Sequence, residues 1–566
     1  MPICLRLALS LALIAAPLGA QNTASDTGPA VKIAGQFAAR ARNDSASVPG
    51  TVGSVDPARA ERPRAVPALT VPKSSATKRV SAPQNLQAAL NKAVAGDSLI
   101  LSGTFRGNFT LPARSCTGWV TIVGAGLATP EGERLTPRAA AALPKLITPN
   151  HEPALRTKNP TCGWRLVGIE VTGTLPVTSM QYGLVWLGDG GDKPAGQTQT
   201  TLAAVPRDII LDRVYIHGSP TLNSTRCLAL NSANTIVINS WFSECHALGA
   251  DSQAIEGWNG PGPYLIENNF LGGAGENIMF GGADPGIANL SPSDITIRRN
   301  HVAKDPAWRG KWTVKNLTEL KNARRVLYEG NVFENTWPAG QESAIVFKSS
   351  QDSCGSCVWE GTSDVTYEWN IVRHAPIALN LQAYDESGQV RTNVWVQRVT
   401  VENNLFAQIG AEGRGALNLW THPLRDVTLS HNTFVHAPGS GGLVFAFAYA
   451  GGAARNIAIS DNVFTAPGGY AVNYDGGQLH SAGFTAMAGD RSWSFERNVI
   501  GGVEGQFSKL YPATNWYPRT VAAIGLGADY SLGPTSPYKA KGRGGKDPGV
   551  DIAELTRRTA GVVVTP

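Results

Sequence analysis

The chain has 566 residues, of which 42% are hydrophobic, and a formal net charge of +6. This positive balance is mild, so it permits an acidic polymer as a partner without requiring one. No segment after the N-terminus approaches membrane-spanning length, so we expect no membrane span. We also expect a monomer that has no nucleic-acid partner.

The N-terminus has the pattern of an export signal. Residues 1–20 read MPICLRLALSLALIAAPLGA, with an arginine near the start, an apolar stretch and a small residue at the end. This pattern predicts a signal peptide cleaved after Ala20, and hence a secreted protein of the periplasm or the cell exterior. A buried N-terminal helix is the alternative. Residues 21–80 are rich in Ala, Arg, Ser, Thr and Pro without periodicity, which predicts a disordered linker.

The next segment, residues 86–101, predicts a helix followed by a strand. Leu86, Ala89, Leu90 and Ala93 recur at helical spacing, so we expect a short amphipathic helix that ends near Gly96. The apolar residues 99–101 then begin a first strand.

Six cysteines remain once residues 1–20 are removed, and an even number in an exported protein indicates disulfides. Fifteen pairings are formally possible. Sequence order favours Cys116–Cys162, Cys227–Cys245 and Cys354–Cys357. A thioredoxin-type redox motif is the alternative for the last pair, but its position in a loop lacks the strand-to-helix context that activates such a thiol.

Eight copies of one short pattern follow along the chain, each with an asparagine at the same place. The copies read IENNFL, IRRNHV, YEGNVF, YEWNIV, VENNLF, LSHNTF, ISDNVF and FERNVI. An apolar strand that recurs at an irregular period of about 30 residues is typical of a solenoid with variable loops. The aligned residues are Asn269, Asn300, Asn331, Asn370, Asn404, Asn432, Asn462 and Asn498.

The strands in these copies alternate apolar and polar residues, and no helical stripe of useful length lies between them. The sequence therefore predicts an all-β fold, a single right-handed parallel β-helix over residues 81–535, with the helix at 86–93 as its N-terminal cap. Asparagine suits the repeated turn because it tolerates a left-handed backbone and its amide can bond to the next coil. Residues 536–566 are expected to form a tail that packs on or near the last coil.

Together these features resemble the superfamily of secreted bacterial β-helix proteins that includes pectate lyases and polygalacturonases. The resemblance covers roughly residues 85–530 and implies a polysaccharide as partner.

A second strand follows each asparagine strand, and aligning its inward residues predicts one outward column. Neighbouring members of this column would lie roughly 5 Å apart. A register slip of two residues would change the membership, and a solvated face with chance charges is the alternative. The predicted column contains Asn231, Glu256, Gly281, Lys321, Lys348, Asn380 and Trp420. Among these residues, and with Glu319 on the same face, we assign Glu256, Glu319, Asn380 and Trp420 to substrate binding.

Lys321 and Lys348 are predicted to be neighbours, where like charges need an anionic partner or ligand. The segments KNARRVLYEGNVFENTW and AIVFKSS resemble the alginate lyase and chondroitinase B family of β-helix lyases. This resemblance implies that Lys321 is the catalytic base and that Lys348 stands where the family has an assisting arginine. The family's Arg-His-Gly is absent at that second position, and lysine cannot copy the bidentate fork of arginine.

The predicted function is therefore β-elimination on an acidic, uronate-containing polysaccharide. This reaction needs cations that neutralise the uronate carboxylate and a group that accepts the neighbouring proton. A C5-epimerase shares the elimination half-reaction. Calcium is a candidate cofactor without a clear site, because Glu256, Glu276 and Glu319 are the only nearby carboxylates.

Two other function classes stay open. A glycoside hydrolase would need converging aspartates, but Asp251, Asp284 and Asp294 fall at loop or strand-start positions. A non-enzymatic carbohydrate-binding or cell-surface protein is the other class, because fold alone does not assign function. Tryptophans concentrated between residues 308 and 420 suit pyranose rings and favour a sugar ligand in either case.

Overall fold

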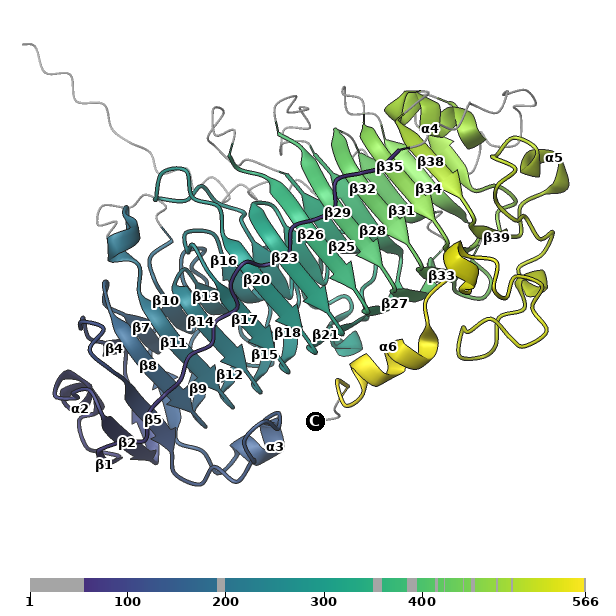
Figure 1. Ribbon diagram of the computed structural model, residues 1–566. Helices are drawn as coiled ribbons and strands as arrows, with labels where there is room; N and C mark the ends of the chain where they lie inside the picture. The colour runs from purple at the N-terminus through teal and green to yellow at the C-terminus, as the bar shows by residue number, and fades with distance from the viewer. Residues whose placement is uncertain are drawn as a thin grey trace, which may run out of the picture.

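The computed structural model describes residues 55–190, 199–349, 359–383, 394–412, 416–421, 423–440, 442–448, 454–474, 477–489 and 492–563. These residues form a solenoid of three long parallel sheets, in which each strand pairs with strands one coil before and one coil after it (Figure 1). The side chains that point inward from all three sheets form one continuous hydrophobic core. The predicted parallel β-helix is confirmed.

The chain visits the three sheets in turn, so each coil contributes one strand to each sheet. The 14-stranded sheet consists of β1 (Ala76–Ser81), β2 (Asp97–Ser102), β5 (Val120–Gly124), β8 (Cys162–Val167), β11 (Arg207–Asp212), β14 (Ala233–Ile238), β17 (Tyr264–Glu267), β20 (Ser293–Arg298), β23 (Ala323–Glu329), β26 (Thr362–Glu368), β29 (Val396–Glu402), β32 (Leu424–Ser430), β35 (Arg455–Ser460) and β38 (Trp493–Glu496).

The 13-stranded sheet consists of β3 (Thr104–Arg106), β6 (Lys145–Thr148), β9 (Glu170–Gly173), β12 (Tyr215–His217), β15 (Trp241–Cys245), β18 (Phe270–Gly273), β21 (His301–Ala303), β24 (Val332–Glu334), β27 (Ile371–Ala375), β30 (Leu405–Ile409), β33 (Thr433–His436), β36 (Val463–Thr465) and β39 (Val499–Gly501).

The 12-stranded sheet consists of β4 (Phe109–Leu111), β7 (Leu155–Thr157), β10 (Val185–Leu187), β13 (Arg226–Leu230), β16 (Gln253–Gly257), β19 (Ile278–Phe280), β22 (Thr318–Leu320), β25 (Ser343–Lys348), β28 (Ile377–Gln382), β31 (Ala416–Thr421), β34 (Leu443–Ala448) and β37 (Val472–Tyr474). The α-helices in the described chain are α2 (Leu86–Asn91), α3 (Pro137–Ala140), α4 (His480–Ala488), α5 (Gly505–Ser508) and α6 (Ile552–Thr559). None of the helices in these ranges is long and apolar enough to cross a membrane.

Helices cover both ends of the core. Leu86 and Leu90 of α2 are buried in the core at the first coil, as the cap prediction requires. Near the last coil, Phe484 and Met487 of α4 are buried in the same core. The open ends of the solenoid are therefore closed by apolar side chains.

The eight aligned asparagines form a buried ladder at the turn between the 14-stranded and 13-stranded sheets. Each side chain is fully buried. Asn300 shows the repeated pattern: its Nδ2 donates to the Ile266 carbonyl and to Asn331 Oδ1, and its backbone N–H donates to the same oxygen at 2.9 Å. The left-handed residue that the turn needs is the one before each ladder position, such as Arg299 with a φ of 54°. Sequence reasoning had given that conformation to the asparagine itself.

The ladder is longer than the sequence pattern indicated. At one end, Ser240 N–H donates to Asn269 Oδ1, and at the other end Asn498 donates to Asn515 Oδ1. The segment INSW around Ser240 has the same pattern with serine in the ladder position. Asn515 lies in a loop without a strand pattern, so no repeat signal marked it.

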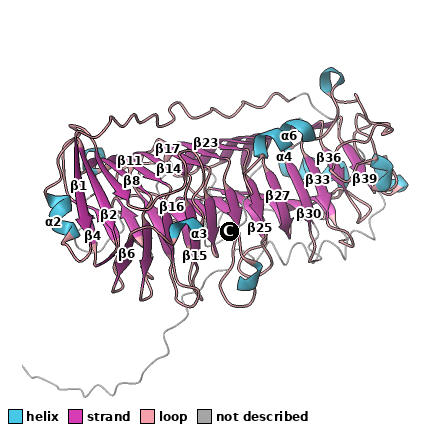
Figure 2. Cartoon of the chain, turned by 90° about the horizontal axis from the view of Figure 1, so that it is seen from below, coloured by secondary structure: helices cyan, strands magenta, loops and turns pink. Residues whose placement is uncertain are grey.

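Residues 55–75 run as an extended strap across the outer face of the 14-stranded sheet, from one strand to the next along the solenoid (Figure 1, Figure 2). The backbone N–H groups of Ala58, Glu61 and Arg64 donate to aspartates on β32, β26 and β20 respectively. Every third residue of the strap thus meets every second strand of the sheet. The spacing matches, because three extended residues and two strand spacings each span roughly 9–10 Å. The accepting aspartates are Asp426, Asp364 and Asp294.

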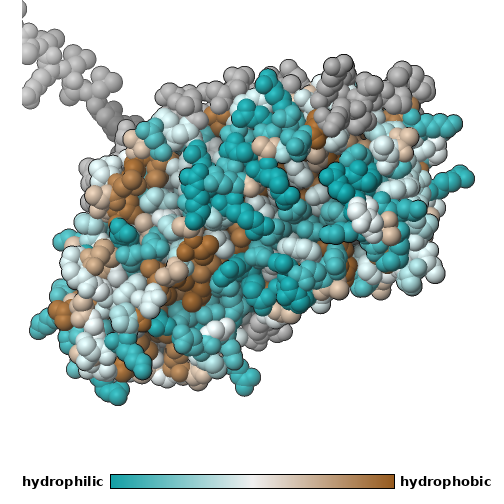
Figure 3. Space-filling model, viewed as in Figure 1, coloured by the Kyte–Doolittle hydropathy of each residue, from teal (hydrophilic) through white to brown (hydrophobic). Residues whose placement is uncertain are grey.

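These aspartates belong to a second polar ladder on that face. Arg325 on β23 pairs with Asp294 at 2.7 Å, and Arg398 on β29 pairs with Asp364 at 2.6 Å. Farther along the strap, Leu69 and Val71 pack against apolar side chains of β11, β14 and β17. Figure 3 shows the surrounding face as mainly hydrophilic with separate apolar patches.

The strap corrects the prediction of a disordered linker for residues 55–80, of which Ala76–Ser81 is strand β1. Residues 1–54, with the predicted signal peptide and the rest of the linker, lie outside the described residues. The start of the tail lies near the last coils, where the Arg543 N–H donates to Asp461 Oδ1, but α6 runs back to the central coils. There Arg558 of α6 pairs with Glu329 at 2.5 Å, and the Val562 carbonyl accepts Arg134 Nη1.

Replacing Asn331 with alanine tests the ladder. The change leaves the N–H groups of Asn300 and the Ile297 carbonyl without their partners. We expect the free energy of unfolding to fall by about 2–4 kcal/mol, because buried polar groups lose their hydrogen bonds. Denaturant unfolding measures this loss, with Asn91→Ala on the exposed side of α2 as the control. Equal losses in the two variants would contradict a special role for the ladder.

A truncation tests the strap. A chain that begins at residue 76 is compared with one that begins at residue 55. We expect a lower unfolding midpoint and a broader transition for the shorter chain, because coils of a solenoid otherwise contact only their neighbours. Circular dichroism during thermal unfolding measures both. Superimposable curves would show that the strap contributes nothing to cooperativity.

Candidate functional site

The outer face of the 12-stranded sheet carries the predicted site residues in two rows. The strand register places Glu256, Met279, Glu319, Val346 and Asn380 side by side on β16, β19, β22, β25 and β28. A second row lies two residues farther along the strands. Since Leu320 pairs with Phe347, Lys321 lies next to Lys348. Three of the predicted substrate-binding residues therefore share one row beside the lysine pair.

The predicted column was wrong in membership, because three of its alignment steps slipped by two residues and one slipped by one residue. Glu256 and Asn380 lie in the row of Glu319 instead of the lysine row. Lys348 pairs with Gln382, which occupies the position that the sequence alignment gave to Asn380. Asn231 is fully buried, and its Oδ1 accepts the backbone N–H groups of Trp258 and Asn259.

Trp420 points into the core, so its predicted outward orientation is wrong. It pairs with Leu381, is 0% exposed, and its ring lies 5.1 Å from that of Phe445. The sequence alignment matched Leu419 to Leu379, whereas the structure pairs Leu379 with Asn418. A shift of one residue reverses the direction of every side chain in a strand. Trp420 therefore cannot contact a ligand on the outer face.

A buried charge cluster includes Glu256 from the first row and Lys321 from the second. We define it as Arg226, Asp251, Glu256, Glu276, Lys315 and Lys321. Lys315 Nζ lies 2.8 Å from Asp251 Oδ1 and 3.3 Å from Glu276 Oε1. Gln253 links the two halves, since its Nε2 donates to Glu276 Oε2 at 2.7 Å and its Oε1 accepts Arg226 Nε at 3.2 Å. Arg226 also pairs with Glu256. Cations and carboxylates thus alternate along one chain of contacts.

The two glutamates of the cluster have opposite pKa shifts. Burial raises the pKa of Glu256 to about 7, and the negative charge of Glu276 adds to the shift although Arg226 and Lys321 oppose it. Burial would also raise the pKa of Glu276, but Lys315 and Lys321 outweigh it and hold that pKa well below its ordinary value. One site therefore contains a carboxyl group that is partly protonated near neutral pH and one that stays ionised.

The catalytic candidates themselves are nearly enclosed. Lys321 is 7% exposed, Lys348 2% and Glu256 1%. A substrate therefore has to displace the side chains that cover these groups. Because these groups are shielded from water, their charges interact more strongly with a bound substrate than charges at an open surface would.

Lys304 holds the turn that carries Glu276. Its fully buried Nζ donates to the carbonyls of Gly273, Ala274 and Gly275 and to Asn277 Oδ1, at 2.5–3.0 Å. Burial lowers the pKa of this lysine well below its usual value. Sequence reasoning missed Lys304, Lys315 and Arg226, because they lie outside the aligned positions of the strands.

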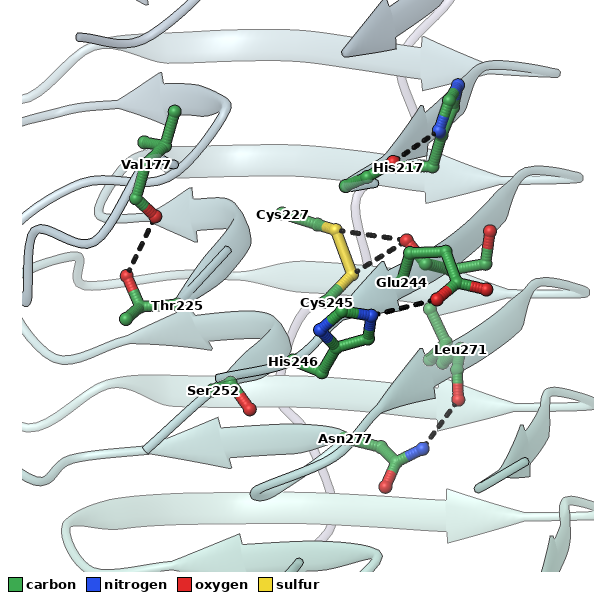
Figure 4. The surroundings of a disulfide bond; sticks show 12 residues. Val177, His217, Thr225, Cys227, Glu244, Cys245, His246, Ser252, Leu271 and Asn277 are labelled. Carbon is green, nitrogen blue, oxygen red and sulfur yellow. Dashed lines mark hydrogen bonds and ion pairs between the residues drawn. A yellow bond between two sulfur atoms is a disulfide. The ribbon is translucent and has the colours of Figure 1, made fainter. Parts of the chain in front are cut away.

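A disulfide fixes the strand that carries Arg226. Cys227 on β13 is bonded to Cys245 on β15, and Figure 4 shows His246 beside this bond with Nε2 directed at Glu244. Cys116–Cys162 is the second bond, so two predicted pairings are confirmed. The predicted Cys354–Cys357 pair lies outside the described residues.

The tryptophans of the central coils, and a cationic pair on another sheet, have structural partners away from this site. Trp308 and Trp337 are buried with Trp312 in a satellite cluster, where they pack loops. Arg373 pairs with Glu334 at 2.5 Å on the 13-stranded sheet, whereas the lysine pair belongs to the 12-stranded sheet. Burial lowers the pKa of the adjacent His374.

The carboxylates proposed as calcium ligands are engaged with cations or amides. Glu256 pairs with Arg226, Glu276 with Lys315, and Glu319 Oε2 accepts Asn316 Nδ2 at 3.1 Å. In the part of the chain that the structure describes, Cys116, Cys162 and Asp208 are the one group with metal-binding spacing, and its cysteines form a disulfide. These observations assign no metal to the site.

No family model and no curated protein matches the chain. Among solved structures, the PL6-family alginate lyase AlyGC superposes at a TM-score of 0.45 with 11% identity, over 87% of this chain and 59% of its own. An alginate lyase from Paenibacillus sp. strain FPU-7 superposes at a TM-score of 0.25 with 12% identity, over 79% of this chain and 98% of its own. A polygalacturonase from Erwinia carotovora subsp. carotovora superposes at a TM-score of 0.31 with 14% identity, over 78% of this chain and 100% of its own.

This chain therefore spans about three fifths of the length of AlyGC. At these identities and TM-scores, the neighbours assign neither a reaction nor a substrate to this chain.

The raised pKa of Glu256 predicts a specific pH dependence of stability. Between pH 4.5, the ordinary pKa, and about 7, the folded chain binds more protons at this group than the unfolded chain does. The free energy of unfolding must therefore fall as the pH rises through this window, by up to roughly 3 kcal/mol from this group. Denaturant unfolding of Glu256→Gln at several pH values should lack this decline. The exposed Glu133→Gln serves as the control, and an unchanged slope in Glu256→Gln would contradict the assignment.

Proposed function

We propose that this chain is a secreted, monomeric polysaccharide lyase that acts by β-elimination on an acidic, uronate-containing polysaccharide. The observation that carries the proposal is the pairing of Lys321 with Lys348 on adjacent strands, beside the buried charge cluster. A uronate carboxylate that enters between the two ammonium groups would be neutralised by them, which lowers the cost of removing the neighbouring proton.

Within this proposal, Lys321 accepts the proton and Lys348 neutralises the carboxylate. Glu256 and Glu276 lie within the electrostatic reach of Lys321 and tie its position to the cluster. Asn380 and Glu319, in the neighbouring row, supply polar contacts for hydroxyl groups of the sugar. Trp420 is excluded from substrate binding by its place in the core.

Absorbance in the unsaturated-uronide band tests this function directly. Purified protein is mixed with alginate, polygalacturonate or chondroitin, and product formation is followed over time. Loss of the base in Lys321→Met should reduce the rate by about 10²–10⁴-fold, as removal of a general base does. Lys92→Met, an exposed lysine on the cap, is the matched control. A Lys321→Met variant that is folded and fully active would eliminate the assignment.

Hydrolysis is the second candidate, and the opposite pKa shifts of Glu256 and Glu276 favour it. A hydrolase needs one protonated and one ionised carboxyl group, and glutamates supply them here in place of the aspartates sought in the sequence. Reducing ends that appear without absorbance, and that depend on Glu256 more than on Lys321, would establish it. Binding of an acidic polymer without any product would indicate a carbohydrate-binding protein instead.

A further inference from the structure

The row of Glu256 continues toward the N-terminal end of the solenoid. Glu256 pairs with Ala229, Ala229 with Trp186, and Trp186 with Arg156. Strands are about 4.8 Å apart, so Trp186 lies roughly 10 Å and Arg156 roughly 14 Å from Glu256 along the solenoid axis. The same face of the sheet therefore connects the charge cluster to these residues.

The character of the row changes along this path from enclosed to open. Glu256 and Ala229 are buried, Trp186 is half-buried and Arg156 is exposed. Tyr182, from the loop before β10, brings its ring to 5.3 Å from that of Trp186, tilted by 37°. Two aromatic side chains and a guanidinium thus lie together on an accessible part of the sheet.

The charges around this group favour an anionic ligand. Arg156 Nε donates to Thr110 Oγ1 at 3.3 Å, and its positive charge acts on the hydroxyl of Tyr182. Lys158, two residues farther, is also exposed. The carboxylate of Glu152 faces the group and accepts a hydrogen bond from the hydroxyl of Tyr182 at 3.2 Å.

We propose that Arg156, Tyr182 and Trp186 form a distal subsite for an acidic oligosaccharide that extends along the solenoid from the buried charge cluster. This proposal rests on the function proposed for that cluster. Aromatic faces with a polar edge pack against pyranose rings. The planar fork of Arg156 matches a uronate carboxylate, which it can bind through two parallel hydrogen bonds.

The distance to the subsite makes its contribution depend on the length of the ligand. Lys321 lies two strands beyond Glu256, so Trp186 is roughly 19 Å from this lysine along the solenoid axis. A trisaccharide centred on Lys321 therefore leaves the subsite empty, whereas a longer chain occupies both. The probes are the tri- and heptasaccharides of guluronate and of galacturonate, with a neutral cello-oligosaccharide for comparison. Titration calorimetry is carried out on Lys321→Met, so that turnover does not consume the ligand.

In that background, Trp186→Ala and Arg156→Ala should each weaken binding of an acidic heptasaccharide by about tenfold, a loss of about 1.4 kcal/mol. Binding of the trisaccharide should stay unchanged. Arg106→Ala, an exposed arginine on the 13-stranded sheet, is the matched control and should bind both ligands normally.

The outcomes separate the subsite from the reaction. Heptasaccharide affinity that is unchanged in Trp186→Ala and Arg156→Ala overturns the subsite, as does a failure of every acidic probe to bind. Neutral chains that bind equally well, without dependence on Arg156, overturn the acidic ligand class. Length-dependent binding that both substitutions weaken supports the subsite even if the wild-type chain forms no product, in which case the proposed lyase function fails alone.

Discussion

The buried asparagine ladder is the interaction on which the arrangement of the coils depends. An amide enclosed in an apolar turn is costly unless its donors and acceptor are all satisfied. From Asn300 onward, each of the eight aligned Asn Oδ1 atoms accepts two N–H groups from the preceding coil, and each Nδ2 donates to a carbonyl of that coil. A coil displaced along its strand direction would break this set of bonds, so the ladder fixes one register for the sheets that meet at the turn.

The strap and the C-terminal tail add contacts that a simple solenoid lacks. Coils in a solenoid touch only their neighbours, so separate parts can open independently. Ala58 contacts Asp426, which is 368 residues away in sequence, and Leu69 packs against side chains of β11, β14 and β17. The tail joins the last coils to the centre through Arg558. These two segments couple the ends of the molecule along the 14-stranded sheet and the edge beside it.

The buried charge cluster has the opposite effect from the ladder, because it lowers the free energy of unfolding. Removing several charges from water is unfavourable, and their mutual pairing recovers only part of the cost. Titratable groups with strongly perturbed pKa values in one place are typical of functional sites. Lys304 and the Cys227–Cys245 bond hold the segments that carry Glu276 and Arg226, so the cluster is held in a fixed geometry by structure around it.

The sequence by itself determined the fold, the asparagine ladder, two disulfides and the capping helix. Each of these depends on local periodicity or on residue type, which a linear chain displays directly. Tertiary structure alone decided the strand register of the 12-stranded sheet. Loops of variable length separate its strands, so a slip of two residues moved Glu256 and Asn380 to another row, and a slip of one sent Trp420 into the core. The strap of residues 55–75 also could not be predicted from the sequence. Its partners are aspartates hundreds of residues away, and its own sequence has no apolar period. Lys321 and Lys348 are neighbours both in the sequence alignment and in the structure, because the alignment between β22 and β25 needed no correction.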